Sequence, residues 1–175
     1  MNTLQDFIEQ ESNNLHFDLA AYNPVIKQVV ATLKLQKQSI TAAESLTAGL
    51  FQATLANISG ASNVFSGGLV TYSMEMKSKL LKINFNLLQK YGVISQWTAE
   101  QMALQSATVM QSDWGVGLTG VAGPETLEQR QVGTVYIGIS NKTDLWCQEF
   151  LFKGQRQMIR EKSVVASFIM LATQL

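Results

Sequence analysis

The apolar residues of this chain recur at two different spacings that alternate along its length. Helical spacing predicts a short helix that carries Leu4, Phe7 and Ile8. It also predicts helices at residues 24–35, 46–57, 77–81, 95–111 and 155–172. Runs rich in β-branched and other strand-forming residues occupy 39–43, 65–73, 113–119, 132–140 and 145–152. Because strands and helices interleave, the pattern predicts an α/β fold, a three-layer α/β/α sandwich around a mixed sheet.

Residues with strong positional preferences mark several of the predicted boundaries. Pro24 stands where helices begin, and Ser95 is a candidate N-cap of the helix that follows it. The polar residues 141–144 separate the last two strands by a short turn, so these strands are expected to form an antiparallel hairpin. The paired glycines at 67–68 permit a bend or a close backbone approach in the second strand.

Composition restricts the classes of partner and of chemistry. The chain has 175 residues, enough for one domain with a substantial core, and its 13 basic and 13 acidic residues balance. Without a charged patch, nucleic acid and anionic membranes are not expected as partners. No apolar run reaches membrane-spanning length and the N-terminus lacks a signal core, which predicts a cytoplasmic protein. One cysteine, Cys147, and one histidine, His16, leave no basis for a thiolate or imidazole metal site, and no metal is expected.

A polar cluster at residues 43–49 is the strongest candidate for chemistry. Ser45 lies between a predicted strand and a predicted helix, where its hydroxyl would meet the positive end of the helix dipole. The same position suits an ordinary N-cap serine. A serine nucleophile needs a base. The only imidazole, His16, lies in the N-terminal segment outside these motifs, so the candidates for the base are Tyr72 and Lys77, at the end of a strand and the start of a helix.

Four motifs together resemble the CinA C-terminal domain family. They are Glu-Ser-Leu-Thr-Ala-Gly at 44–49, Tyr-Ser-Met-Glu-Met-Lys at 72–77, Tyr-Gly-Val-Ile-Ser at 91–95, and Thr-Gly-Val-Ala-Gly-Pro-Glu at 119–125 running on to 132–135. The resemblance covers residues 23–174 and leaves 1–22 as an N-terminal extension, so the expected organisation is an extension followed by an amidohydrolase domain at 23–175.

The resemblance implies the activity of nicotinamide mononucleotide deamidase, which hydrolyses the mononucleotide to nicotinate mononucleotide and ammonia in pyridine-nucleotide salvage. It assigns Ser45 as the nucleophile that forms an acyl-enzyme, acting with Tyr72 and Lys77. An ordinary lysine, with a pKa of about 10.4, is protonated at neutral pH, so Lys77 must be desolvated to serve as a base. Tyr72 could relay the proton instead. The family implies no cofactor and commonly dimerises, and Trp97, Trp114 and Trp146 offer possible interface aromatics.

Other residues are candidates for substrate binding. The small-residue loop at 120–124 could hold a phosphate or a ribose, although an ordinary turn has the same pattern. Arg156 matches a family Phe-x-Gly-x-Arg pattern at the head of the last helix and could bind a phosphate through two N–H groups. The full set of binding candidates is Glu44, Thr47, Gly49, Thr119, Gly120, Gly123, Arg130 and Arg156.

Several residues depart from the family pattern. Ala48 and Gln155 replace the usual Gly and Asp, Gln129 and Gln131 replace Gly and Pro, and Met74 stands where the family usually has Asn. The loss of the amide at Met74 removes a donor and an acceptor between Tyr72 and Lys77. The alternative function is therefore a non-catalytic nucleotide-binding module of the same fold.

Overall fold

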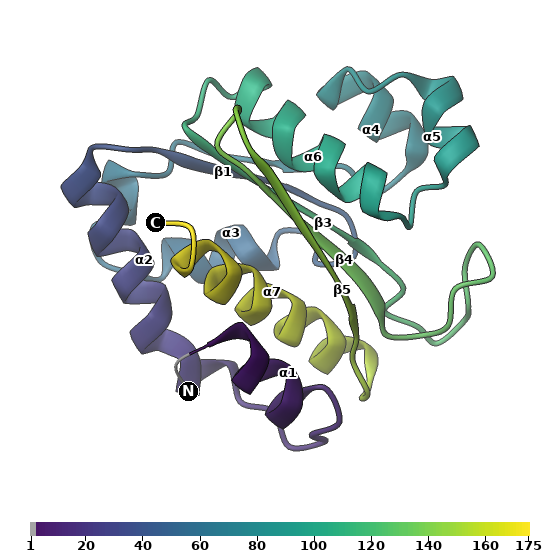
Figure 1. Cartoon of the computed structure of the whole chain (residues 1–175), viewed down its shortest axis with the longest axis horizontal. Helices are drawn as coiled ribbons and strands as arrows, with labels where there is room; N and C mark the ends of the chain where they lie inside the picture. The colour runs from purple at the N-terminus through teal and green to yellow at the C-terminus, as the bar shows by residue number, and fades with distance from the viewer. Residues whose placement is uncertain (1–2) are drawn as a thin grey trace.

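The computed structural model describes residues 3–175 as helices packed on both faces of a five-stranded sheet (Figure 1). The strand order is β2-β1-β3-β4-β5. The sheet and its flanking helices confirm the predicted α/β fold. In chain order the elements are α1 (Leu4–Glu11), η1 (Leu19–Tyr22), α2 (Asn23–Gln36), β1 (Ile40–Glu44), α3 (Leu50–Ala56), η2 (Ala61–Asn63), β2 (Leu69–Val70), α4 (Met74–Leu81), α5 (Phe85–Tyr91), α6 (Gln96–Val109), β3 (Trp114–Gly120), β4 (Thr134–Ser140), β5 (Leu145–Leu151) and α7 (Arg156–Ala172).

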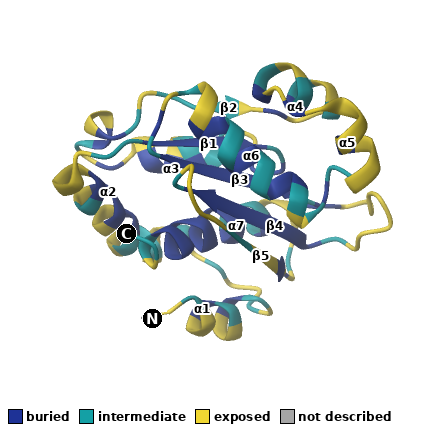
Figure 2. Ribbon diagram, turned by 45° about the horizontal axis from the view of Figure 1, so that its top comes forward, coloured by how far each residue is buried: buried dark blue, intermediate teal, exposed yellow. Residues whose placement is uncertain are grey.

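Apolar side chains fill the space between the sheet and the helices of each outer layer. Helices α4, α5 and α6 cover one face of the sheet, while α2, α3 and α7 cover the other (Figure 1). The larger core cluster joins α2, α3 and α7 to the sheet, and α7 is buried along most of its length (Figure 2). The central strands β1, β3 and β4 are buried almost throughout, as strands covered on both faces must be.

The strand directions bring the ends of three strands to one edge of the sheet. Strand β1 runs parallel to β2 and to β3, whereas β4 is antiparallel to β3 and β5 is antiparallel to β4. The paired residues at the carboxyl end of β1 are Glu44 with Val70 and Glu44 with Leu118. The segments that follow β1, β2 and β3 therefore start side by side, which is where ligands bind in open α/β sheets.

Most of the predicted boundaries agree with the structure. Pro24 lies in the first turn of α2, and the Ser95 hydroxyl accepts a hydrogen bond from the Thr98 N–H at the start of α6. Strands β4 and β5 form the expected antiparallel hairpin. These boundaries depend on local backbone chemistry, which explains why the sequence alone identifies them.

Two predicted elements differ from the observed ones, and helix α5 was not predicted. The helix expected at 46–57 begins only at Leu50, because Ala48 and Gly49 adopt positive φ angles of 48° and 94°. The strand expected at 65–73 is observed over two residues only, Leu69–Val70. Gly68, directly before it, lies close to the backbone of β1, because a Cβ on Gly68 would lie 2.8 Å from the Ala42 carbonyl oxygen. Helix α5 was not expected, since its seven residues carry too short an apolar pattern.

Helix α1 packs against α7 and contributes to the larger core cluster. The Phe7 side chain is fully buried and meets Phe152 edge to face, with ring centroids 6.2 Å apart. The ammonium of Lys162 on α7 donates to the carbonyl oxygens of Asn14 and Lys153, which ties the segment after α1 to the loop before α7. Within residues 3–175, no helix is long and apolar enough to cross a membrane.

Candidate active site

Ser45 and Lys77 form a hydrogen-bonded pair at the carboxyl edge of the sheet. Ser45 follows the last residue of β1, and Lys77 lies in the first half of α4 with only 1% of its surface exposed. The Lys77 Nζ lies 3.0 Å from the Ser45 Oγ and donates to the Thr71 carbonyl oxygen at 2.8 Å. The predicted nucleophile and the predicted base are thus within proton-transfer distance.

Burial lowers the pKa of Lys77 from 10.5 to about 8, because the protein interior disfavours the charged ammonium. The negative charge of Glu128 acts in the opposite direction and raises this pKa. Among residues 3–175, Nζ has two hydrogen-bond partners, the Ser45 hydroxyl and the Thr71 carbonyl oxygen. A neutral amine fits these partners, since it can donate to the carbonyl and accept the Ser45 O–H with its lone pair.

Glu44 holds the turn that carries Ser45. Its carboxylate is fully buried and accepts hydrogen bonds at 3.0 Å from the backbone N–H groups of Gly49, Phe51 and Gln52. Glu44 therefore accepts the hydrogen bonds of the N–H groups at the N-terminus of α3. Ser45 does not cap this helix end, and the helix end is not open to an oxyanion. Both results differ from the interpretation of the sequence. Glu44 acts here as a structural anchor.

A cavity of about 330 Å³ opens beside Ser45. The Tyr72 ring is 56% exposed at its rim, and the Tyr72 hydroxyl oxygen accepts a hydrogen bond of 2.8 Å from Arg156 Nη2. Arg156 also donates through Nη1 to the Gly123 carbonyl oxygen. Arg156 therefore joins the segment after β2 to the loop after β3. The cavity is lined by Ser45, Leu46, Tyr72, Gly120, Val121, Ala122, Gly123, Pro124, Glu125, Thr126, Leu127 and Arg156.

The other binding candidates do not line this cavity. Thr47 is fully buried, and Gly49 is the N-cap of α3 with its N–H on Glu44. The Thr119 hydroxyl donates to the Val93 carbonyl oxygen at 2.6 Å. The Arg130 guanidinium lies over the Tyr136 ring, 5.7 Å from its centroid. In this structure the contacts of these residues are with other residues of the protein and not with the cavity.

Met74 also lies away from the cavity lining. Its side chain packs against the apolar cluster that contains Leu81 and Met102 and is absent from the cavity lining. The departure from the family pattern at this position therefore contributes to apolar packing, and the hydrogen bond between Lys77 and Ser45 is present alongside it.

Two residues of the site were not among the sequence candidates. The Arg160 guanidinium binds the carbonyl oxygens of Leu46 and Thr47 directly after Ser45. Glu128 accepts from the N–H groups of Val93 and Ile94, both at 3.0 Å, and fixes the loop after β3. The spacing of four residues between Arg156 and Arg160 places both on one side of α7 and was the signal available for Arg160. No sequence signal marked Glu128.

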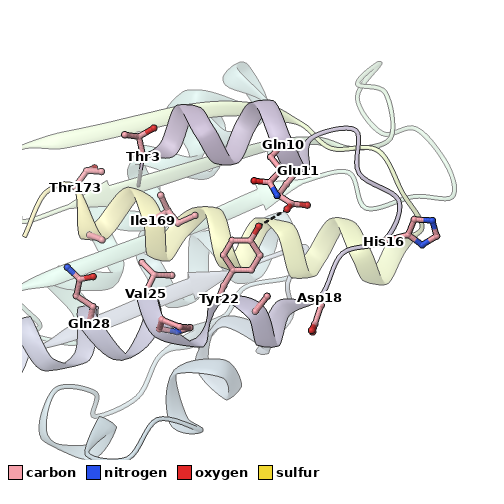
Figure 3. A pocket seen from close by; sticks show the side chains of 13 residues that line it. Thr3, Gln10, Glu11, His16, Asp18, Tyr22, Val25, Gln28, Ile169 and Thr173 are labelled. Carbon is pink, nitrogen blue, oxygen red and sulfur yellow. Dashed lines mark hydrogen bonds between the residues drawn. The ribbon is translucent and has the colours of Figure 1, made fainter. Parts of the chain in front are cut away.

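A larger cavity of about 780 Å³ lies between α1, α2 and α7 (Figure 3). Its central carboxylate, Glu11, accepts hydrogen bonds from the Tyr22 hydroxyl and the Asn14 amide. Its histidine, His16, lies at the outer end of the cavity, pointing away from Glu11 (Figure 3). Among the described residues that line this cavity, no nucleophile is paired with a base, so the smaller cavity beside Ser45 is the candidate active site. Across residues 3–175 there is no group of three His, Cys, Asp or Glu side chains that could hold a metal ion.

Comparisons with known proteins agree with the motifs. Residues 22–175 match the CinA C-terminal domain family. A competence-damage inducible protein of Streptococcus agalactiae is 58% identical over 118 residues, which are 67% of this chain and 28% of that protein. A relative with the same description from Streptococcus equi subsp. zooepidemicus is 48% identical over 136 residues, 78% of this chain and 32% of its own length. The chain thus spans about a third or less of these relatives.

Solved structures share the fold over nearly the whole chain. A competence/damage inducible protein from Agrobacterium tumefaciens superposes with a TM-score of 0.83 at 26% identity, covering 91% of this chain and 97% of its own. A competence-damaged protein superfamily member from Escherichia coli gives a TM-score of 0.86 at 23% identity, covering 93% and 95%. The arrangement of helices and strands around the candidate site is therefore the one found in these proteins.

Proposed function

Since the chain belongs to the CinA C-terminal domain family, we propose that it is an amidohydrolase that converts nicotinamide mononucleotide to nicotinate mononucleotide and ammonia. The observation that carries the proposal is the 3.0 Å hydrogen bond between Lys77 Nζ and Ser45 Oγ, in a place where burial lowers the lysine pKa to about 8. A serine hydroxyl requires such a base to become a nucleophile.

The proposed reaction proceeds through an acyl-enzyme. Neutral Lys77 accepts the Ser45 proton while Oγ adds to the carboxamide carbon, and the resulting ammonium then protonates the departing amine as the C–N bond breaks. Ammonia leaves and the nicotinoyl group remains esterified to Ser45. A water molecule, deprotonated by Lys77, then attacks the ester, and the Ser45 oxygen takes the proton back.

The cavity supports a nucleotide-sized substrate. Its volume of about 330 Å³ falls within the range of small-molecule sites, and Ser45 forms part of its wall. Arg156 lies at its rim with two N–H groups engaged by Tyr72 and Gly123, which leaves three of its five donors for a phosphate. The Tyr72 hydroxyl accepts from Arg156, so its own proton is available to a substrate or to a proton relay.

The deciding experiment measures ammonia release and nicotinate mononucleotide formation when the purified chain is mixed with nicotinamide mononucleotide. Ser45→Ala should lower turnover by at least about 10³-fold with the fold intact, and Lys77→Met should lower turnover far more than nucleotide affinity. Ser62→Ala, at an exposed serine outside the cavity, is the matched control. Binding of the mononucleotide without ammonia release would contradict the proposal and indicate a nucleotide-binding module.

A further inference from the structure

Two side chains anchor the loop after β3 on the same short segment of the chain. The Thr119 hydroxyl, near the end of β3, donates to the Val93 carbonyl oxygen at 2.6 Å. The Glu128 carboxylate accepts from the Val93 and Ile94 N–H groups, one on each oxygen and both at 3.0 Å. The connection between α5 and α6 therefore holds the loop at both of its ends.

These two anchors enclose the part of the loop that lines the candidate active site. Every residue from 120 to 127 lines the cavity, whereas neither Thr119 nor Glu128 does. We call residues 120–127 the wall segment. Its residues 124–127 are exposed, so burial in the core contributes little to their position. That position depends instead on hydrogen bonds, which Arg156 makes within the segment and Glu128 makes at its end.

The backbone on both sides of the Glu128 contact has the conformation that the contact requires. Glu128 and Gln129 have φ angles of 50° and 59°, which residues with a Cβ adopt when surrounding contacts enforce them. Gly92 precedes the two N–H groups, and a Cβ on it would lie 2.7 Å from a Glu128 carboxylate oxygen. The N–H groups of Val93 and Ile94 lie just before α6, where the helix dipole favours a negative charge.

We infer that Glu128 is a positioning residue for substrate binding, which together with Thr119 holds the wall segment in place before the substrate arrives. The inference rests on the proposed function, because it takes the proposed substrate to bind in this cavity. A wall that is already ordered spares the substrate the conformational cost of ordering it, so releasing the wall lowers affinity. Glu128 acts through the wall segment and does not need to touch the substrate.

The test compares nicotinamide mononucleotide binding and turnover in the natural chain and in Glu128→Ala, which lacks both acceptors. The calorimetric Kd and the KM should rise about tenfold, the equivalent of one hydrogen bond to a charged group. On the high-pH plateau kcat should stay within about threefold, because Ser45 and Lys77 belong to other segments. Faster hydrogen exchange at the Val93 and Ile94 amides would verify that the contact is lost.

Further variants separate hydrogen bonding from charge. Glu128→Asp keeps a negative charge but shortens the side chain by one methylene, so it should show most of the loss in affinity. Gly92→Ala leaves Glu128 unchanged and places a methyl group against its carboxylate, so the KM should rise here too. Gln131→Ala, at an exposed residue of the same loop outside the cavity lining, is the matched control and should stay within about threefold. Natural affinity in Glu128→Asp would show that charge suffices and would overturn the inference.

The outcomes also distinguish this inference from the proposed function. If the natural chain binds no mononucleotide, both proposals fail. If it binds the mononucleotide without releasing ammonia, the function fails and the Kd values still decide the role of Glu128. If it releases ammonia and Glu128→Ala keeps its KM within about threefold, the positioning role is wrong and the function stands. Should thermal unfolding show that Glu128→Ala does not fold, Thr119→Val, which removes the other anchor, decides: natural affinity overturns the inference.

Discussion

Arg156 Nη2 donates a hydrogen bond of 2.8 Å to the Tyr72 hydroxyl oxygen, which joins two candidate residues that are 84 positions apart in sequence. The contact links the segment after β2 to the first turn of α7. It also gives Tyr72 a fixed orientation at the rim of the cavity, although more than half of its surface is exposed. The two residues should therefore behave as one unit.

A double-mutant cycle tests this coupling. Tyr72→Phe and Arg156→Ala should be non-additive in kcat/KM, with an interaction energy of about 0.5–3 kcal/mol, as expected for residues in direct contact. The four proteins of the cycle are compared under one set of assay conditions. Strict additivity would show that the hydrogen bond has no role in turnover.

Arg156 should also discriminate between nucleotide and nucleoside. Arg156→Ala is expected to weaken binding of nicotinamide mononucleotide by about 1.5–3 kcal/mol, the value of a hydrogen bond to a charged group. Binding of the nucleoside, which lacks the phosphate, should hardly change. Calorimetric titration of both ligands against both proteins measures the difference, and an equal loss for the two ligands would mean that Arg156 shapes the cavity through Tyr72 and Gly123.

The lowered pKa of Lys77 predicts the pH dependence of turnover. The amine is the active form, so kcat/KM should rise about tenfold per pH unit below a midpoint near 8 and level off above it. Thermal unfolding measured over the same pH range is the control for loss of structure. A profile that stays flat between pH 6 and about 9 would exclude Lys77 as the base.

Glu128 should adjust that midpoint. Its negative charge raises the pKa of Lys77, so Glu128→Gln is expected to move the midpoint to lower pH. Glu161→Gln, which removes the charge of a half-buried glutamate on α7, is the matched control and should leave the midpoint in place. A Glu128→Gln midpoint at higher pH would contradict the electrostatic assignment.

Glu44 is expected to affect stability more than binding. Glu44→Gln replaces a buried carboxylate that accepts three N–H hydrogen bonds, which should lower the free energy of unfolding by about 2–3 kcal/mol. Urea unfolding measures this loss. If stability is unchanged and only KM rises, Glu44 belongs to the binding site after all.

The sequence predicted the fold well where local chemistry determines structure. Pro24, the Ser95 cap and the turn at 141–144 act over a few residues, and each boundary follows from its own neighbours. The position of Ser45 beside Lys77 depends on the adjacent ends of β1 and β2. The sequence named Lys77 and Tyr72 as alternatives for the base, and the motif resemblance grouped both with Ser45. The separation of Ser45 and Lys77 along the sequence carries no information about the contact between their side chains.

The turn around Ser45 was the main feature that sequence patterns could not supply. Apolar periodicity placed the start of the helix near residue 46, whereas the positive φ angles of Ala48 and Gly49 delay it to Leu50. Those angles depend on Glu44 and on Arg160, which lies 113 residues after Thr47. Long-range hydrogen bonds of this kind override local preferences, and periodicity carries no information about them.

The connections after three parallel strands divide the site into a reactive pair and an outer wall. The reactive pair comes from the connections after β1 and β2, whereas the outer wall of the cavity comes from the loop after β3. Two of the departures from the family pattern, Gln129 and Gln131, fall in that loop, outside the segments that carry Ser45 and Lys77. Evolution and protein engineering can therefore vary the specificity of this scaffold by exchanging one loop, while the hydroxyl and amine that would perform the chemistry keep their geometry.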